Sequence, residues 1–476
     1  MSEADLRVPF ARRAHAALED AHLQEALGIA TTKFIGLRKD SFAGFPEGEA
    51  LRDRARAIKE RTLRELDRHL GRLADSVERL GGHVHWARTG EEAREIVLRL
   101  CRDKGVRMAV KSKSMATEEI GLNDALEAAG VKPVETDLGE YIIQLAREKP
   151  SHIIAPAIHK TKGQVADLFS KELGGRFEAD PEVLTAVARK ELRQKFLDAD
   201  MGITGANFAV AETGTIVLVT NEGNGRMVTS LPRIHVAVMG MEKVIPTMTD
   251  LMVFLAILAR SATGQKLSSY TTLVRGPRRP GETEGPDELH LILMDNGRVP
   301  QIAGPLREAL HCLRCGACLN VCPVYRQIGG HAYGYTYPGP IGILLTAMLK
   351  GAASVKELAH ASSLCGACKD VCPVRIDIPR MLVDLRAELD RDRIASWPER
   401  VLFGIVRRIM TSPTLWRFGA ALGRILQRPF VSQGRLRGMP LFLGKWTRTR
   451  DLPPVASRTF SERWGELERS PDGRRP

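Results

Sequence analysis

The chain has 476 residues, which is enough for two or three domains, and its 43% apolar content can supply ordinary hydrophobic cores. The formal net charge is +13, and much of the excess is local, because residues 401–450 contain ten Lys or Arg and no Asp or Glu. Such a block indicates an anionic partner, but only 5% of residues are aromatic and no DNA- or RNA-binding motif is evident, which makes nucleic acid the weakest candidate.

No targeting or membrane-spanning segment is evident in the sequence. The first residues contain no apolar stretch of the signal-peptide type, and the longest apolar run, Leu251–Ala259, is far too short to cross a bilayer. We therefore expect a cytoplasmic protein. Its basic tail is compatible with peripheral association at the inner face of the membrane, or with an acidic protein surface.

Taken in chain order, the predicted elements divide the sequence into four regions. Residues 1–65 are expected to be helical, since apolar side chains recur at helical spacing from Leu51 onward. Residues 66–298 alternate short apolar strands with amphipathic helices, a pattern typical of an α/β domain with a mostly parallel sheet. The expected strands lie in HVHWA, VRMAVKS, VKPVET, HIIAPAI, FAVAETGTIVLVT, RIHVAVMG and ELHLILMDNG. Residues 299–385 form a cysteine-rich unit predicted to be all-helical, and residues 386–476 form a basic C-terminal region with a helix in ERVLFGIVRRIMTSP.

Two related runs hold seven of the eight cysteines. The first, CLRCGACLNVCP at 312–323, has the spacing of bacterial ferredoxins, in which three thiolates wrap one corner of an iron–sulfur cube and the fourth ligates the neighbouring cluster. The second, SSLCGACKDVCP at 362–373, repeats the pattern with serine at its first ligand position. This rule assigns one cluster to Cys312, Cys315, Cys318 and Cys372, and another to Cys322, Cys365 and Cys368.

Zinc is the alternative metal for these cysteines. Zinc sites usually have two CxxC pairs that are well separated in the sequence. Seven cysteines in two nested runs fit that pattern poorly. Dense cysteines in one part of a large cytoplasmic chain also argue against disulfides. Cys101, on a predicted helix outside the two runs, is interpreted as a core thiol.

Ser362 leaves the second cluster one thiolate short. Its fourth iron could be bound by the Ser362 oxygen or a nearby residue, left open to water or to a partner's ligand, or lost to give a three-iron cluster. We expect a four-iron cluster in the intact assembly, with that corner labile in the isolated chain.

Stretches outside and inside the cysteine runs carry a resemblance to a known family. They are VKSKSMATEEIGLNDALEAAG (110–130), FAVAETGTIVLVTNEGNGRMVTSLPRIHVAVMG (208–240), HAYGYTYPGPIG (331–342) and the two runs themselves. Together they resemble the lactate utilization protein B family over nearly the whole chain. The resemblance implies an α/β LUD domain similar to sugar-phosphate isomerases and CoA-transferases, an all-α ferredoxin-like domain with two [4Fe-4S] clusters, and a helical C-terminal region.

The resemblance also implies a function and partners. The chain would be the iron–sulfur electron-transfer subunit of an NAD-independent L-lactate dehydrogenase complex, which converts lactate to pyruvate. Its expected partners are a cysteine-rich electron-transfer subunit and a smaller LUD-domain subunit. Serine at position 362 would be a family trait. No convincing flavin or nicotinamide fingerprint is evident in the sequence. The sequence therefore does not identify the cofactor that first accepts electrons from lactate, nor the final electron acceptor.

Polar residues that follow predicted strands are candidates for a lactate site, because open α/β sheets bind ligands at the carboxyl ends of their strands. We single out Lys111, His159 and Glu212 and expect them to face one cleft. Each has an ordinary structural role as its alternative: Lys111, for example, could be a solvated charge. The other candidates are Ser112, Lys113, Glu118, Glu119 and Thr213.

Two further functions compete with electron transfer. In the first, the chain is a ferredoxin-like adaptor whose LUD domain only docks partner subunits. In the second, it is a CoA-transferase-like enzyme with Glu212 as nucleophile, which would leave seven cluster cysteines unexplained. The sequence does not separate the adaptor from a subunit with a substrate site.

Overall fold

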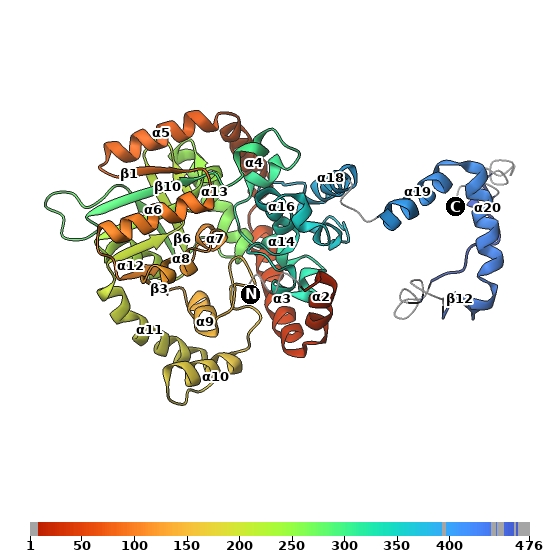
Figure 1. Cartoon of the computed structure of the whole chain (residues 1–476), viewed down its shortest axis with the longest axis horizontal. Helices are drawn as coiled ribbons and strands as arrows, with labels where there is room; N and C mark the ends of the chain where they lie inside the picture. Colours follow the sequence, from red (N-terminus) through yellow and green to blue (C-terminus); the bar gives the residue numbers. More distant parts are fainter. Residues whose placement is uncertain (1–7, 393–396, 439–443, 445–451, 461–462, 465–476) are drawn as a thin grey trace. The chain divides into compact units, whose positions relative to one another are not determined.

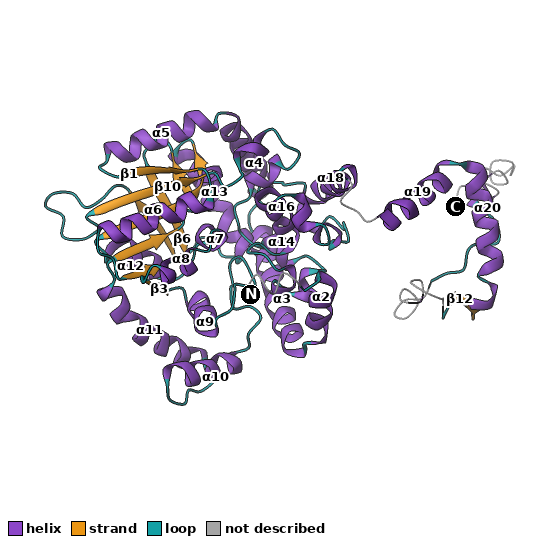
Figure 2. Cartoon of the chain, viewed as in Figure 1, coloured by secondary structure: helices purple, strands orange, loops and turns teal. Residues whose placement is uncertain are grey.

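Six parallel strands form the main sheet of a computed structural model of the chain, in the order β1-β10-β7-β4-β2-β3 (Figure 2). The structure describes residues 8–392, 397–438, 444, 452–460 and 463–464. The neighbouring interior strands β7 and β10 are almost wholly buried, as expected for parallel strands that read as continuous apolar runs. The six are β1 (His83–Ala87), β2 (Met108–Lys111), β3 (Lys132–Glu135), β4 (Met201–Thr204), β7 (Ile234–Gly240) and β10 (Glu288–Met294).

Helices cover both faces of this sheet and form a separate apolar cluster on each. Ala109 of β2 belongs to one cluster and its neighbour Val110 to the other, because successive strand residues point to opposite faces. Cys101 is buried in the first cluster beside Met201, and burial raises the pKa of its thiol to about 11. The helices are α5 (Leu66–Arg79), α6 (Gly90–Asp103), α7 (Met115–Glu119), α8 (Leu122–Ala128), α9 (Leu138–Ala146), α10 (Lys162–Leu173), α11 (Pro181–Asp198) and α12 (Asn224–Ser230).

A second sheet departs from the single sheet that we expected. β5 and β6 form an antiparallel hairpin, which is possible because Gly214 adopts a φ of +67° at the turn, a conformation that favours glycine. A Cβ on Gly214 would also lie only 2.8 Å from the Ser76 backbone of α5. The strands follow the order β8 (Val244–Ile245), β5 (Phe208–Val210), β6 (Thr215–Thr220) and β9 (Tyr270–Val274), and α13 (Met248–Ala262) packs beside β5.

The predicted strand HIIAPAI is wrong. Residues 152–158 form turns and bends instead. The ring of His152 accepts hydrogen bonds through Nδ1 from the N–H groups of Ile154 (3.1 Å) and Ala155 (3.2 Å), which folds the backbone back on itself. Pro156, which has no N–H to donate to a strand ladder, follows at once.

The predicted N-terminal helices pack against the cysteine-rich unit (Figure 1). α3 contacts α14 and α15, and the Arg326 guanidinium donates to the Thr31 hydroxyl at 3.2 Å. The helical stretch from Leu51 breaks at Glu65, where φ is −118° and ψ is 37°. The helices of both regions are α2 (Phe10–Glu19), α3 (Ala21–Ala43), α4 (Gly48–Arg64), η2 (Val299–Ile302), η3 (Arg307–His311), α14 (Ala317–Asn320), α15 (Tyr325–Ile328), η4 (His331–Tyr333), α16 (Gly339–Lys350), η5 (Ala352–Val355), η6 (Leu358–His360), α17 (Ala367–Asp370) and α18 (Ile378–Arg391). The short helix η1 (Met241–Lys243) belongs to the α/β region, where it connects β7 to β8.

The chain divides into two compact units, with the boundary after Asp392. The expected α/β domain followed by a helical cysteine-rich domain is confirmed in the first. The second contains α19 (Trp397–Thr411), α20 (Pro413–Leu426), η7 (Arg428–Phe430), β11 (Val431–Ser432) and β12 (Arg435–Leu436). Among the described residues of the whole chain, no helix combines the length and the apolar character needed to cross a membrane.

The second unit exposes apolar and basic side chains together. On α19, Leu402, Phe403 and Ile405 are each more than half exposed, at 55%, 62% and 54%. Trp416 and Phe418 of α20 are similarly exposed, at 52% and 67%. Exposed apolar side chains beside cations are typical of a segment that binds an acidic protein surface or an anionic lipid surface.

We predict that the full chain binds vesicles of mixed neutral and anionic phospholipid, or its acidic partner, in a salt-sensitive way. Changing Arg407 and Arg408 together to Gln should weaken binding by about 1 kcal/mol per residue, because each charge interacts with the anionic surface. Co-sedimentation at low and high salt measures this, with the double change to Lys as the charge-preserving control. Association that is equal at both salt concentrations would contradict a role for the charge.

Candidate metal centre and the cavity beside it

Four cysteines from both runs line one small cavity. They are Cys312, Cys315, Cys318 and Cys372, and each is at most 8% exposed. The first three lie on the loop between η3 and α14 and on α14 itself, and Cys372 follows α17. The segment after α17 thus returns to the first run, as the ferredoxin pairing rule requires.

Backbone N–H groups point at two of these sulfur atoms. The Arg314 N–H donates to Cys312 Sγ at 3.4 Å, and the Ile376 N–H donates to Cys372 Sγ at 3.3 Å. Arg314 has a φ of +62° and Gly316 a φ of +73°, so the chain turns tightly around the cavity. Such donors stabilise negative charge on sulfur and tune the potential of a bound cluster.

The protonation of these cysteines also fits a metal centre. Burial, together with the neighbouring Cys312 and Cys372, raises the pKa of the Cys315 thiol to about 12. Burial and the other cysteines likewise raise the pKa of Cys318. A cationic metal core between these sulfurs would offset the cost of ionising buried thiols and hold them as thiolates. The donor set therefore fits an iron–sulfur cluster.

The second set of cysteines lies closer to the surface. Cys322 and Cys368 are buried, whereas Cys365 is exposed. Burial, with Cys322 and Cys365 next in importance, raises the pKa of Cys368 to about 12. Cys368 is also among the neighbours that raise the pKa of Cys318, so the two sets are close together.

A much larger cavity, of about 1180 Å³, lies beside the first set. Its wall includes segments that follow β2 and β4 and the end of β7, which places it at the carboxyl ends of three parallel strands. The 153–158 loop and one face of α3 contribute apolar side chains. Leu313, Arg314 and Cys315 complete the wall, so the cavity reaches a candidate cluster ligand directly.

The three residues singled out for lactate binding do not line this cavity. The Lys111 ammonium group is 1% exposed, not solvated, and lies 2.6 Å from the Glu135 carboxylate. Glu212 is exposed and accepts a hydrogen bond from the Met248 N–H at 3.1 Å. A role for these side chains in substrate binding therefore stays a prediction. Ser112 and Lys113, from the wider candidate group, do line the cavity.

His159 lies at a different contact between the α/β and cysteine-rich regions. Its Nε2 is 2.7 Å from Glu148, and its ring meets that of His331 at 4.5 Å between centroids. One possible ligand atom from each of the three lies within 4.8 Å of the others, a spacing that could hold a metal. Lys160 also binds Glu148 at 2.7 Å, so the carboxylate already has two hydrogen-bonded partners.

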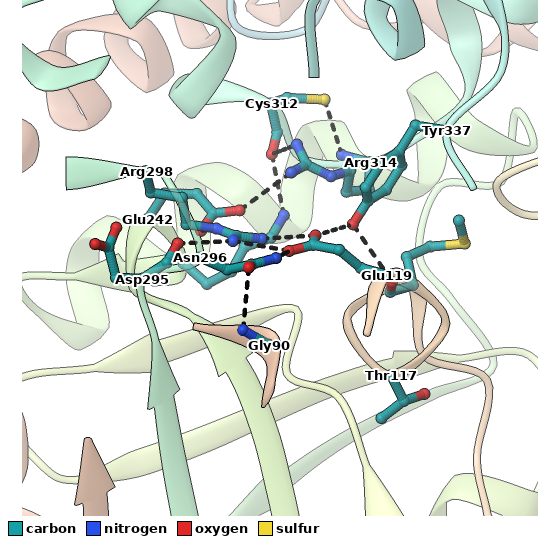
Figure 3. A network of polar contacts seen from close by, with 12 residues as sticks. Gly90, Thr117, Glu119, Glu242, Asp295, Asn296, Arg298, Cys312, Arg314 and Tyr337 are labelled. Carbon is teal, nitrogen blue, oxygen red and sulfur yellow. Dashed lines mark hydrogen bonds and ion pairs between the residues drawn. The ribbon is translucent and has the colours of Figure 1, made fainter. Parts of the chain in front are cut away.

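A buried ion network joins the strand ends to the first cysteine loop (Figure 3). The Arg298 guanidinium lies 2.6 Å from Glu242 and 2.8 Å from Glu119, and none of the three side chains exceeds 3% exposure. Arg314, within the cysteine run, lies 3.2 Å from the other oxygen of Glu242. Tyr337 donates to Glu119 at 2.8 Å.

Electrostatics keep this network charged. Burial alone would raise the pKa of Glu242, but Arg298, Arg314 and nearby lysines lower it to about 2. Removing a single member would leave a buried charge without a partner, which is costly in a low-dielectric interior.

Sequence reasoning missed most of this network. Of its members it considered only Glu119, and that as a substrate candidate. Two signals were available: Arg314 lies between two predicted ligands, and Tyr337 lies in the HAYGYTYPGPIG stretch. Neither signal identifies the partners Glu242 and Arg298, which come from distant parts of the chain.

Comparison with known families divides the chain into three matched parts. The LUD domain matches residues 70–294, the 4Fe-4S dicluster domain matches residues 308–376, and the C-terminal domain of lactate utilisation protein B matches residues 389–468.

Full-length relatives agree with these matches. Lactate utilization protein B of Shouchella clausii is 44% identical over 95% of this chain and 96% of its own length, and that of Geobacillus kaustophilus is 43% identical over 95% and 96%. An uncharacterized electron transport protein of Escherichia coli, YkgF, is 42% identical over 95% of both chains. A solved protein of the DUF162 family from Deinococcus radiodurans covers 48% of this chain and 98% of its own, with a TM-score of 0.28 and 14% identity, too low to support an argument.

We predict that Arg298→Met destabilises the protein by about 3–5 kcal/mol, because Glu119 and Glu242 lose a shared buried cation. The change should lower the thermal unfolding midpoint and the iron content of the anaerobically purified chain. Arg380→Met is the matched control, since Arg380 forms ion pairs with 47% of its side chain exposed, which contribute about 1 kcal/mol or less. Equal midpoints for the two variants would show that the network is dispensable.

Proposed function

The chain belongs to the lactate utilization protein B family, and on that premise we propose that it is the iron–sulfur electron-transfer subunit of an L-lactate-oxidising complex. The relatives named for lactate utilization and the 4Fe-4S dicluster match support this function together. The buried sulfur set around one cavity gives it a structural basis.

We propose that the cysteines hold two [4Fe-4S] clusters. The first would be bound by Cys312, Cys315, Cys318 and Cys372, and the second by Cys322, Cys365 and Cys368. When bound, such clusters accept and pass on one electron each. Oxidation of lactate to pyruvate releases two electrons and two protons, so two neighbouring clusters suit a relay from a two-electron donor to a later acceptor.

One observation carries the proposal furthest: the large cavity at the strand ends reaches Cys315. An electron donor bound there would lie against a ligand of the first cluster, without protein between them. The cavity offers Ser112, Ser114 and the ammonium group of Lys113 to a carboxylate such as lactate. Lys113 Nζ lies 3.0 Å from Glu140 Oε1, and this ion pair keeps the ammonium group in position.

The other end of the route is the second cysteine set. Because Cys365 is exposed, a partner subunit can approach the second cluster closely from outside. We propose that the partner on this side is the cysteine-rich electron-transfer subunit, and that a smaller LUD-domain subunit completes the system. Electrons would then pass from the cavity through the first and second clusters to that partner.

The competing functions make different use of the same features. An adaptor that only docks partners has no need for a cavity that ends at Cys315. A CoA-transferase with Glu212 as nucleophile would place its chemistry on an exposed residue at the turn of the β5–β6 hairpin, outside the cavity. The electron-transfer function uses both the cavity and the cysteines.

We predict that lactate bleaches the cluster absorbance of the complex assembled anaerobically with its partner subunits, and that Ala30→Trp slows bleaching about tenfold or more. Ala30 lines the cavity from α3, so a bulky ring there would obstruct the donor. Ala21→Trp, at an exposed position of the same helix outside the cavity, is the control. Reduction by dithionite should be equal in all variants. If Ala30→Trp bleaches at the normal rate, the cavity is not the donor site and the adaptor function is favoured.

A further inference from the structure

The two cysteine runs have the same backbone shape, although their sequences differ at the first ligand. Arg314 and Leu364, two residues after the first ligand position of each run, have φ values of +62° and +53°. Gly316 and Gly366 follow with φ values of +73° and +86°. A four-residue helix comes next in both runs, α14 in the first and α17 in the second. Left-handed φ values are uncommon for non-glycine residues, and here they occur at matching positions of both runs. This match indicates that both runs are folded to bind the same kind of group, which we propose is an iron–sulfur cluster.

Ser362 takes the place of Cys312 in this shared shape. In the first run, the Arg314 N–H donates to Cys312 Sγ at 3.4 Å. In the second, the Leu364 N–H donates to Ser362 Oγ at 3.2 Å. The same backbone donor thus holds the hydroxyl oxygen where the first run holds its sulfur. Ser362 is also anchored through its carbonyl, which accepts from the Arg386 guanidinium at 3.3 Å.

We propose that Ser362 Oγ is the fourth protein ligand of the second cluster; this rests on the proposed two-cluster assignment. The hydroxyl loses its proton to solvent as its oxygen binds the iron that Cys322, Cys365 and Cys368 leave free. Ser362 is half-buried beside an exposed Cys365, so water can carry the proton away. With this ligand, the second cluster is complete without any contribution from a partner subunit.

Oxygen ligation gives the second cluster a distinct iron. Oxygen is a harder donor than thiolate and suits iron–sulfur chemistry less well, so this iron should be released first on oxidation. The first cluster, with four thiolates, should lack such a corner. The ligand sets of the two clusters therefore differ by one atom at one matched backbone position.

The test compares Ser362→Ala, Ser362→Cys and Ser363→Ala with the unchanged full-length chain, reconstituted anaerobically with ⁵⁷Fe. Ser363 is the control, because it is the adjacent serine, is exposed, and lies off the matched position. Mössbauer spectra, iron content and electron paramagnetic resonance are recorded before and after a mild oxidant. No lactate is added, so failure of the electron-transfer proposal would not alter the result.

We expect the unchanged chain and Ser363→Ala to hold two four-iron clusters, one with a distinct iron that mild oxidant removes. Ser362→Ala should lose the signal of that iron and give a three-iron cluster, whereas Ser362→Cys should keep all four irons through the same treatment. If Ser362→Ala has the spectrum and oxidation behaviour of the unchanged chain, water or another residue is the ligand and the proposal is wrong. Should Ser362→Ala fail to fold, Ser362→Cys still decides: no gain in resistance to oxidant would overturn the proposal.

Discussion

The pairing of Arg298 with Glu119 and Glu242 is the constraint on which the candidate site depends. Glu119 and Glu242 belong to the α/β region, and Arg314 extends the network into the first cysteine run. Charges with so little exposure must be paired, so the strand ends and the cysteine loop cannot separate without leaving a buried charge alone. The network thereby sets where the large cavity meets Cys315. Lys243 adds a further link, since its ammonium group donates to the Cys312 carbonyl at 3.0 Å.

The N-terminal helices constrain the other side of the first cluster site. Arg52 of α4 is buried, and its guanidinium donates to the Cys372 carbonyl at 2.9 Å. Arg38 of α3 donates to the carbonyl of Val371, the residue before Cys372, at 3.0 Å. The first cysteine set is therefore enclosed between the α/β region and the helices that precede it. The second set differs in keeping an exposed member, Cys365.

The sequence predicted those features whose cause is local or repetitive. Period-two and helical apolar patterns located most strands and helices. Cysteine spacing placed Cys372 with the first run, and the two do line one cavity, but the assignment of ligands to two clusters stays a prediction. HIIAPAI was mistaken for a strand because its apolar composition is typical of one. The composition does not indicate that the N–H groups of Ile154 and Ala155 donate hydrogen bonds to the His152 ring. The Arg298 network was missed because its members are far apart in the chain and become partners only after folding. Lys111 was correctly placed at the end of a strand, but its buried partner Glu135 lies on the neighbouring strand β3, a pairing that the sequence pattern alone could not indicate.

The order in which lactate reduces the two proposed clusters tests the proposed route from the cavity to the surface most directly. In the assembled complex, freeze-quenched samples can be followed by electron paramagnetic resonance, with Ser362→Cys used to identify the signal of the second cluster. We predict that the cluster proposed to be bound by Cys312, Cys315, Cys318 and Cys372 is reduced first and that the second cluster follows. Reduction of the second cluster before the first would show that electrons do not arrive through the cavity at Cys315, and would contradict the account.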